Sequence, residues 1–364
     1  MSQMSAPASA DRARRRRSGS ASRHRRPLVR FLCRRAGVAL LLAVGVTLVT
    51  FVLTNLVPGD PATANLGEQA SSDPAAVAEY RRQHGLDQPL PIQYARYLED
   101  LARGDLGQSQ QSHQPVLTDL RAAVPATMEL AALAILLSLL VGVASGVVSA
   151  LHRNRLGDHV LRVLSLLFVS MPTFWLALVA FYVFFDQLGW AAGSGRLDPG
   201  VTAPANVTGL YTVDAVLAGQ WFTFWNAVSH LILPALVLTA HTVGLLTRFT
   251  RSAVLEVLSQ DYVRSARAKG LPERTVLVHY VLRGALVPVI TVAGLAFGAL
   301  LSGTVLVESI FAWPGLGGYA FRSATTFDLP AVMGVGLVIG TIYLFVNLAV
   351  DVLYGVIDPR ARVQ

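Results

Sequence analysis

Six apolar stretches, each about as long as a membrane-spanning helix, constrain this sequence more than any other feature. The hydrocarbon core of a bilayer requires about 20 consecutive apolar residues in an α-helix. Lipid offers no partner to backbone N–H and C=O groups, so each span must satisfy its own hydrogen bonds. The sequence therefore predicts an all-α polytopic membrane protein with six transmembrane helices. The predicted spans lie near residues 36–57, 126–151, 161–185, 228–246, 285–311 and 331–357.

The cationic residues predict how these spans are oriented. If the N-terminus is inside, 23 of the 30 Lys and Arg residues lie on the inner side of the membrane and seven lie on the outer side. Cytoplasmic loops carry such an excess of cations, so both termini are predicted to be cytoplasmic. Charged residues make up only 14% of the chain, against about 25% in soluble domains. The excess of cations in the cytoplasmic segments therefore accounts for the net charge of +8, which does not indicate nucleic-acid binding.

The polar segments divide the chain into regions. Residues 1–27 are rich in Ser, Ala and Arg and are predicted to be a disordered cytoplasmic tail that helps to set the topology. Such an Arg cluster also attracts anionic lipid headgroups. A first transmembrane helix is predicted over 28–57, an extracytoplasmic subdomain over 58–123 and the main transmembrane domain over 124–357. Residues 358–364 form a second cytoplasmic tail.

The outer regions carry their own signals. Within 58–123, amphipathic helices are predicted over 74–83 and 92–102, and a second outer loop over 188–226 is rich in Gly, Pro, Trp and Tyr. The first span has an alternative interpretation as a cleaved signal peptide, because Ala62-Thr63-Ala64 matches a cleavage site. Its apolar stretch of 22 residues is longer than the 7–15 expected of a signal core, which favours a retained anchor.

Motifs for catalysis, cofactors and metals are missing from the sequence. There is no G-x-x-x-x-G-K-[ST] loop for ATP phosphates, no H-E-x-x-H pair and no G-x-S-x-G elbow. The single cysteine, Cys33, excludes an intrachain disulfide. His230 and His241 share one predicted span, where hydrogen bonding is favoured over a metal or proton site. No catalytic, cofactor-binding or metal-binding residue is therefore predicted.

The few unusual residues within the spans indicate helix packing and shape. Glu129, Glu308 and Asp351 lie near predicted membrane faces and are expected to reach the headgroups, which argues against a proton relay. Glycine pairs at a spacing of four let helix backbones approach closely. Prolines bend helices, and such bends fit either static kinks or a conduit that changes shape. The glycine pairs are Gly142/Gly146, Gly294/Gly298 and Gly336/Gly340, and the prolines are Pro172, Pro234 and Pro288.

The cytoplasmic loop over 248–284 is basic and has the pattern of a short helix between two spans. Asp261 is predicted to be its N-cap, and residues 262–269 make about two turns. Gly270 is placed for a left-handed stop, and Pro272 for the first turn of the next helix. Ser265, Ala266 and Ala268 leave room for another protein, and Arg264, Arg267 and Lys269 offer charge-assisted bonds. On charge alone, an ordinary solvated interfacial helix would be favoured.

Several motifs, in order along the chain, resemble one family. DYVRSARAKGLPERTVLVHYVLRGALVPVIT (261–291) is similar to the cytoplasmic loop of the dipeptide/oligopeptide/nickel branch of ABC importer permeases. In the wider superfamily this is the E-A-A-x-x-x-G loop, with Arg264-Ser265-Ala266 at the E-A-A place and Gly270 at the glycine. Arg264 and Arg283 depart from the superfamily pattern and agree with the peptide branch. NLVPGDPA (55–62), VPATMELA (124–131), VESIFAWPGLGGYA (307–320) and DVLYGVIDPRAR (351–362) also fit.

The resemblance implies a type I ABC importer (MetI-like) transmembrane domain in a bacterial inner membrane. The chain would pair with a second homologous permease, two ATP-binding subunits that hold ATP and Mg, and an extracytoplasmic substrate-binding protein. Residues 261–271 would sit in a groove of one ATPase. The implied coupling residues are Asp261, Tyr262, Arg264, Ser265, Ala266, Arg267, Ala268, Lys269, Gly270 and Leu271.

Two other classes of protein stay open at this stage. A secondary transporter or channel would work without an ATPase, and a membrane-anchored interaction protein or enzyme would act through residues 58–123. The transported solute is not specified by the sequence. Dipeptides, longer peptides, nickel chelates and other small solutes all fit the resembled branch.

Overall fold

The computed structural model describes residues 37–38, 41–49, 51–52, 73–83 and 85–357. The predicted tails over 1–27 and 358–364 lie outside these residues. The predicted first span is described only in part, as helix at 37–38, 41–49 and 51–52.

The described chain is helical, and no strand occurs within it. Four of its helices are long and apolar enough to cross a membrane, and a bent helix pair makes a fifth if it is counted as one span. Together with the partly described first span, this agrees with the six predicted transmembrane helices.

In chain order the elements are α4 Pro74–Gln83, α5 Leu90–Ala102, α6 Val116–Leu151, α7 Leu156–Ser170, α8 Thr173–Ala180, η1 Phe181–Gln187, α9 Tyr211–Leu217, α10 Trp221–Leu258, α11 Asp261–Ala268, α12 Glu273–Thr275, η2 Val276–Leu282, α13 Arg283–Gly303, α14 Val305–Ile310, α15 Leu316–Thr325 and α16 Leu329–Ile357.

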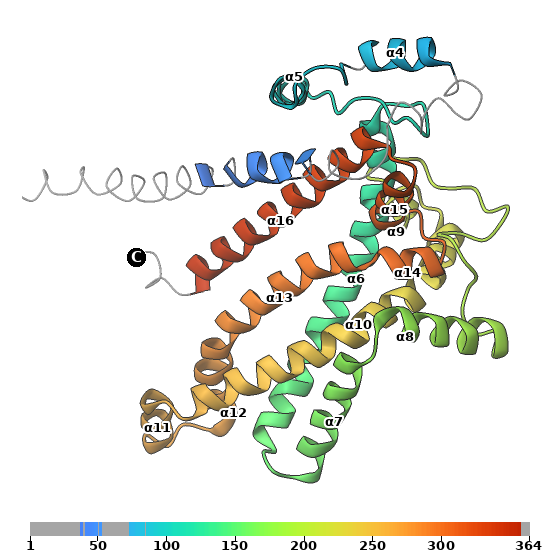
Figure 1. Cartoon of the computed structure of the whole chain (residues 1–364). Coiled ribbons are helices and arrows are strands. Elements are labelled where there is room, and N and C mark those ends of the chain that lie inside the picture. Colours follow the sequence, from blue (N-terminus) through green and yellow to red (C-terminus); the bar gives the residue numbers. More distant parts are fainter. Residues whose placement is uncertain (1–36, 39–40, 50, 53–72, 84, 358–364) are drawn as a thin grey trace, which may run out of the picture.

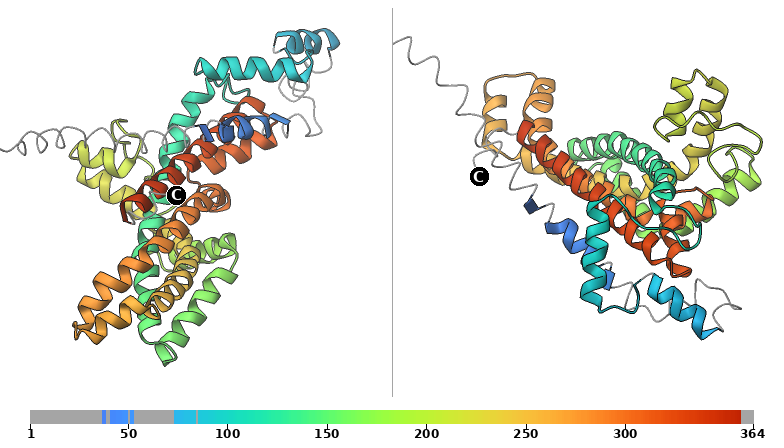
Figure 2. Two further views of the ribbon diagram at one scale, coloured as in Figure 1. Left: turned by 90° about the vertical axis from the view of Figure 1, so that its left-hand side faces the viewer. Right: turned by 90° about the horizontal axis from the view of Figure 1, so that it is seen from above.

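The long helices form a bundle with α10 at its centre. Helix α10 packs against α6, α7 and α13, and α13 packs in turn against α16 (Figure 1). The short helices α4 and α5 lie at one end of this bundle and α11 lies at the other, as two views agree (Figure 2). The outer subdomain and the cytoplasmic loop expected from the sequence are therefore at opposite ends of the molecule.

Small residues bring the long helices close together. A Cβ added at Gly146 of α6 would lie 2.6 Å from Thr250 Cβ of α10, and one added at Gly142 would lie 2.8 Å from Leu246 Cβ. Gly294 and Gly298 of α13 face Val350 and Tyr343 of α16 in the same way. Packing of this kind is what associates helices in lipid, where apolar burial between helices contributes little. These predicted glycine pairs therefore serve contacts within the chain.

The three span prolines behave differently from one another. Pro234 and Pro288 lie inside the continuous helices α10 and α13. At Pro172 the predicted span over 161–185 is broken, because α7 ends at Ser170 and α8 begins at Thr173 with a bend of 98° between them. Pro172 has no N–H to continue the helix, which permits a break at this position.

The outer helices agree with the sequence pattern, and two of the spans are longer than predicted. The predicted span over 285–311 is interrupted instead, because α13 ends at Gly303 and the short helix α14 follows. Helix α4 covers Pro74–Gln83, the predicted 74–83, and α5 begins two residues earlier than predicted, at Leu90. Helix α6 begins at Val116 and α10 at Trp221, before the apolar stretches at 126 and 228. Hydropathy marks only the part of a helix that lies in lipid, so the polar extensions at both helices were missed.

Candidate functional site

Helix α11 lies at the free end of α10, where the predicted coupling loop was expected (Figure 1). Gln260 is its N-cap, with extended backbone (φ −72°, ψ 146°), and Asp261 is its first helical residue. The prediction of Asp261 as N-cap is therefore wrong by one position. Asp261 still places a negative charge in the first turn, where the helix dipole favours it.

Gly270 ends α11 in the left-handed conformation, as predicted. Its φ is +73°, and its N–H donates to the carbonyl of Arg267 at 2.9 Å. No atom of this chain lies within 4 Å of the position that a Cβ would occupy. A side chain at this position would therefore cost backbone strain, and it would point into space that is open in the isolated chain.

One face of α11 is buried against its own chain. Val263 and Ala266 are buried in an apolar cluster to which α6, α10, η2 and α13 also contribute, and half-buried Leu271 packs against that cluster. Ala266 was expected to leave room for a partner, and this expectation is corrected because its side chain faces inward. Burial therefore packs α11 against both α10 and α13.

The opposite face of α11 is exposed and charged. It consists of Asp261, Tyr262, Arg264, Ser265, Arg267, Ala268, Lys269 and Gly270. Arg264 Nη1 lies 3.7 Å from Asp261 Oδ1. Arg267 donates two hydrogen bonds to Glu273, at 3.0 and 3.2 Å. Within the part of the chain that is described, Lys269 forms no ion pair, so it is free to meet an acidic group of a partner.

Tyr262 links this face to the next span. Its hydroxyl lies 2.7 Å from where a Cβ would stand on Gly284, near the start of α13. Partial burial raises the pKa of the Tyr262 phenol above its usual value. Only glycine at position 284 allows so close an approach, so the two residues form a direct contact between α11 and α13.

An ion pair with a fully buried carboxylate joins the ends of three helices. Arg251 of α10 donates to both carboxylate oxygens of Asp158 on α7, at 2.8 and 2.9 Å. Ser149 of α6 donates to Asp158 as well, at 2.5 Å. Arg251 was counted among the loop cations, but it belongs to α10 and has a structural partner. The sequence around Asp158 contains no motif that would have predicted this ion pair.

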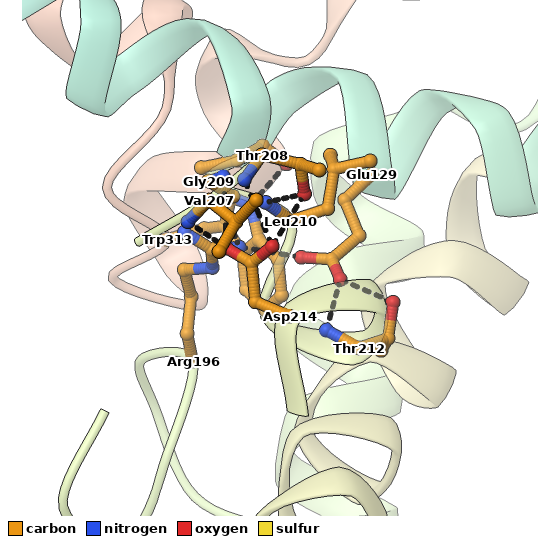
Figure 3. A network of polar contacts seen from close by, with 10 residues as sticks. Glu129, Arg196, Val207, Thr208, Gly209, Leu210, Thr212, Asp214 and Trp313 are labelled. Atoms are coloured by element: carbon orange, nitrogen blue, oxygen red, sulfur yellow. Dashed lines mark hydrogen bonds and ion pairs between the residues drawn. The ribbon is translucent and has the colours of Figure 1, made fainter. Parts of the chain in front are cut away.

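A second polar network lies among α6, the second outer loop and α9 (Figure 3). Arg196 donates to Glu129 at 2.6 Å, with both side chains only 6% exposed, and its guanidinium lies 3.5 Å from the ring centroid of Tyr211. Glu129 also accepts bonds from the N–H and hydroxyl of Thr212. The expectation that Glu129 reaches the headgroups is wrong, because this acid is buried and paired.

Asp214 of α9 orders the loop beside this pair. Its carboxylate accepts hydrogen bonds from the N–H groups of Val207, Thr208 and Gly209 and from the Thr208 hydroxyl (Figure 3). Burial alone would raise the pKa of Asp214, but these bonds, led by those from Thr208, outweigh it and lower the pKa. Thr208 therefore helps to order this loop.

Glu308 of α14 is buried in a third network. It accepts hydrogen bonds from Thr127 at 2.6 Å, Thr304 at 3.0 Å and the N–H of Gly318 at 3.0 Å. A Cβ on Gly315 or Gly317 would collide with its carboxylate, which explains the glycines of the stretch 307–320. Like Glu129, Glu308 does not reach the headgroups as expected. The side chain of Asp351 lies outside the described residues.

The two span histidines lie in different environments. His230 Nδ1 is 2.9 Å from the carbonyl of Asn226, and its Nε2 is 3.4 Å from Asp198 Oδ1. His241 is half-buried, and its Nδ1 has no hydrogen-bond partner among the described residues. In the part of the chain searched, no group of three His, Cys, Asp or Glu side chains is arranged to hold a metal.

Comparisons with known proteins give a consistent picture along the chain. Residues 142–363 match the family described as binding-protein-dependent transport system inner membrane component. Residues 28–131 match the N-terminal region described for membrane components of such systems. A family match therefore covers most of the sequence, including α10, α11 and α13.

Individual relatives align over nearly their whole length. The chain is 48% identical over 324 residues to the probable D,D-dipeptide transport system permease protein DdpB of Escherichia coli, covering 89% of this chain and 94% of that protein. It is 44% identical over 338 residues to the di/tripeptide transport system permease protein DppB of Pseudomonas aeruginosa, covering 93% and 100%. A solved structure of the methionine ABC transporter MetNI, inward facing, matches 66% of this chain at 16% identity with a TM-score of 0.46.

Proposed function

Because this chain belongs to the family of binding-protein-dependent transport system inner membrane components, we propose that it is the permease subunit of an ABC importer that carries peptides or related small solutes inward across the cytoplasmic membrane. It is a multi-pass membrane protein with transport, rather than catalysis, as its task. Permeases of this family work with ATPase and substrate-binding partners, and the printed names of its relatives support peptides as the solute class.

The proposal extends to partners and orientation. Two ATP-binding subunits hold ATP and Mg, and this chain has no ATP site of its own. A second homologous permease completes the path, and a substrate-binding protein docks on the outer end near α4 and α5. Both termini face the cytoplasm, where the Arg-rich tail meets anionic lipid. The cation bias of the sequence supports this orientation.

The observation that carries the proposal is the construction of α11. Its charged face is free, its apolar face is buried against α10 and η2, and Tyr262 contacts Gly284 of α13. An ATPase that binds the exposed face of α11 moves α10 and α13 together. ATP-driven closure of the ATPase pair then turns the path outward, and hydrolysis resets it. Asp261, Tyr262, Arg264, Ser265, Arg267, Ala268, Lys269 and Gly270 contact the ATPase, whereas Ala266 and Leu271 anchor the segment.

The test is Gly270→Asp in the complete complex reconstituted into proteoliposomes. We expect solute uptake and solute-stimulated ATP hydrolysis to fall at least about tenfold, because the left-handed position costs a non-glycine residue about 1–2 kcal/mol and the added carboxylate enters the docking surface. The mutant protein should insert normally, since no atom of its own chain lies within 4 Å of the new Cβ.

Gly219→Asp is the matched control. Gly219 also has a positive φ, +67°, and open space around its Cβ position, but it lies at the start of α10, away from α11. It should transport normally. Uptake by Gly270→Asp at the level of the unmodified protein would show that α11 does not couple to an ATPase. Solute uptake by the chain without any nucleotide-hydrolysing subunit would instead favour a secondary transporter or channel.

A further inference from the structure

The broken span borders an open cavity beside the centre of α10. The cavity has a volume of about 410 Å³ and is lined from three sides. Residues 169–173 of the α7–α8 break form one side, Leu238, His241, Thr242 and Leu245 of α10 form the second, and Ala296, Ala299 and Leu300 of α13 form the third. Its size is in the range of cavities that hold small ligands, roughly 300–1,000 Å³.

The break itself supplies backbone polar groups to this cavity. The Leu167 carbonyl near the end of α7 accepts from the Met171 N–H at 3.1 Å, whereas the carbonyls after it and the first N–H groups of α8 lie beyond the regular pattern of their own helices. Leu176 N–H donates to the Pro172 carbonyl, so the intrahelical pattern resumes only after the bend. At membrane depth, irregular backbone is tolerated only where it is covered by protein or lines a hydrated cavity. The break therefore offers donors and acceptors suited to a polar solute.

His241 adds a side chain that lacks a partner. It lines the cavity, and its buried Nδ1 has no hydrogen-bond partner in the described chain. A buried polar atom without a partner is costly, so such an atom calls for an explanation. The neighbouring Thr242 differs, because its hydroxyl donates to the Leu238 carbonyl at 3.1 Å. His241 is thus the polar side chain from α10 that is available to a solute.

The cavity has no charged lining residue. A full counter-charge would bind a charged solute tightly and hold it, whereas a path needs binding that is strong enough to admit the solute and weak enough to release it. Neutral donors and acceptors beside small apolar side chains suit a solute whose own charges balance. A short zwitterionic peptide has that chemistry.

We propose that this elbow cavity, formed by residues 169–173 with α10 and α13, binds a short zwitterionic peptide in transit, with the His241 imidazole as its main side-chain contact. The proposal rests on the proposed transport function and assigns a solute site within the path. Ala296 and Ala299 keep the α13 side open, because larger side chains there would fill the cavity.

Solute protection tests the site directly. Cys33 is the only cysteine of the chain, so Cys33→Ser provides a background for single cysteines. The probe is whichever alanyl di-, tri- or tetrapeptide the unmodified complex takes up fastest, at about 10 mM, since a path site binds weakly. We expect this peptide to slow thiol modification of Ala299→Cys severalfold. Leu295→Cys, one turn away on the exposed surface and outside the cavity lining, should be unaffected.

Substitutions at His241 give an independent measurement. We expect His241→Leu to lower uptake about tenfold while ATP hydrolysis stimulated by the binding protein stays within about twofold, because a solute hydrogen bond is lost and the coupling segment is untouched. His241→Gln should restore part of the uptake.

Contrary results separate the two proposals. If the unmodified complex takes up no peptide, the proposed peptide transport fails. If it takes up peptide but Ala299→Cys is unprotected, or Leu295→Cys is protected equally, the elbow site is wrong. Normal uptake by His241→Leu would overturn the role of the imidazole.

Discussion

At the scale of single residues, buried charges hold the outer half of the chain together. Glu129, Asp214 and Glu308 are each surrounded by donors from other segments, and Arg196 neutralises Glu129. Asp328 does the same at the start of α16, where it accepts from Ser109 at 2.6 Å and from two backbone N–H groups of the outer segment. These acids fix loops onto helices, so they are structural groups and not steps of a proton relay.

The Glu129–Arg196 pair makes the first residue-scale prediction. Arg196→Met should lower the free energy of unfolding by about 3–5 kcal/mol, because it leaves a buried carboxylate without its counter-charge. Thermal or denaturant unfolding in mild detergent measures the loss. Arg103→Met is the control, since Arg103 pairs with Glu99 on the surface (side chains 68% and 60% exposed) and should cost about 0–1 kcal/mol. Equal losses for the two variants would contradict the structural role of the pair.

Residue roles were predictable where backbone geometry dictated them. Gly270 was assigned a left-handed stop from its place after a short helix, and its φ is +73°. The inward face of Ala266 and the true N-cap at Gln260 were missed. An eight-residue helix carries too little periodicity to show which side is buried, because its packing depends on residues far away in the chain.

At the scale of elements, close contact between α6 and α10 organises the bundle. Gly142 and Gly146 of α6 face Leu246, Thr247 and Thr250 of α10 at distances that exclude any side chain. The Asp158–Arg251 pair then joins α7 to the same end of α10. The ends of α6, α7 and α10 near this ion pair are therefore held together.

This contact predicts a packing defect for Gly146→Leu. The new side chain would collide with the Thr250 side chain and the Thr247 carbonyl, and overpacking of this kind costs about 1–3 kcal/mol. A lowered unfolding temperature of the purified protein, with less of it recovered from membranes, is the expected result. Gly157→Leu is the control, because nothing lies within 4 Å of its Cβ position. Unchanged stability of the Gly146 variant would mean that α6 and α10 pack less closely.

Hydropathy predicted the spans better than their ends or breaks. The apolar stretches over 126–151 and 228–246 lie within α6 and α10, but each helix extends beyond its stretch. The kink at Pro172 was expected, whereas its size, 98°, was not, because the same residue type leaves α10 and α13 continuous at Pro234 and Pro288. Tertiary packing decides which proline breaks a helix.

At the scale of the whole molecule, the bundle has two different ends. The helices α4 and α5 lie at one end of the bundle and α11 lies at the other (Figure 2). Cation bias assigns α11 to the cytoplasm. The ATPase and the substrate-binding protein proposed above would therefore meet different ends of the same helices.

Cysteine accessibility in whole cells tests this orientation. In the Cys33→Ser background, exposed Asn206→Cys in the second outer loop should react with a membrane-impermeant maleimide in cells whose outer envelope is opened. Exposed Ala268→Cys on α11 should react only after the inner membrane is permeabilised, because the label cannot cross that membrane. The reverse pattern would place α11 outside and exclude contact with cytoplasmic ATPases.

The unbroken course of α10 has a consequence for how such a protein can vary. Helix α10 runs from Trp221 to Leu258, about 57 Å against a hydrocarbon thickness of about 30 Å. One inserted residue would rotate the part of the chain beyond it by about 100° around the helix axis. Seven inserted residues make close to two full turns. They would nearly restore the orientation of the following part but would move it about 10 Å along the helix axis. Helix α10 therefore tolerates changes of residue type better than changes in the number of its residues.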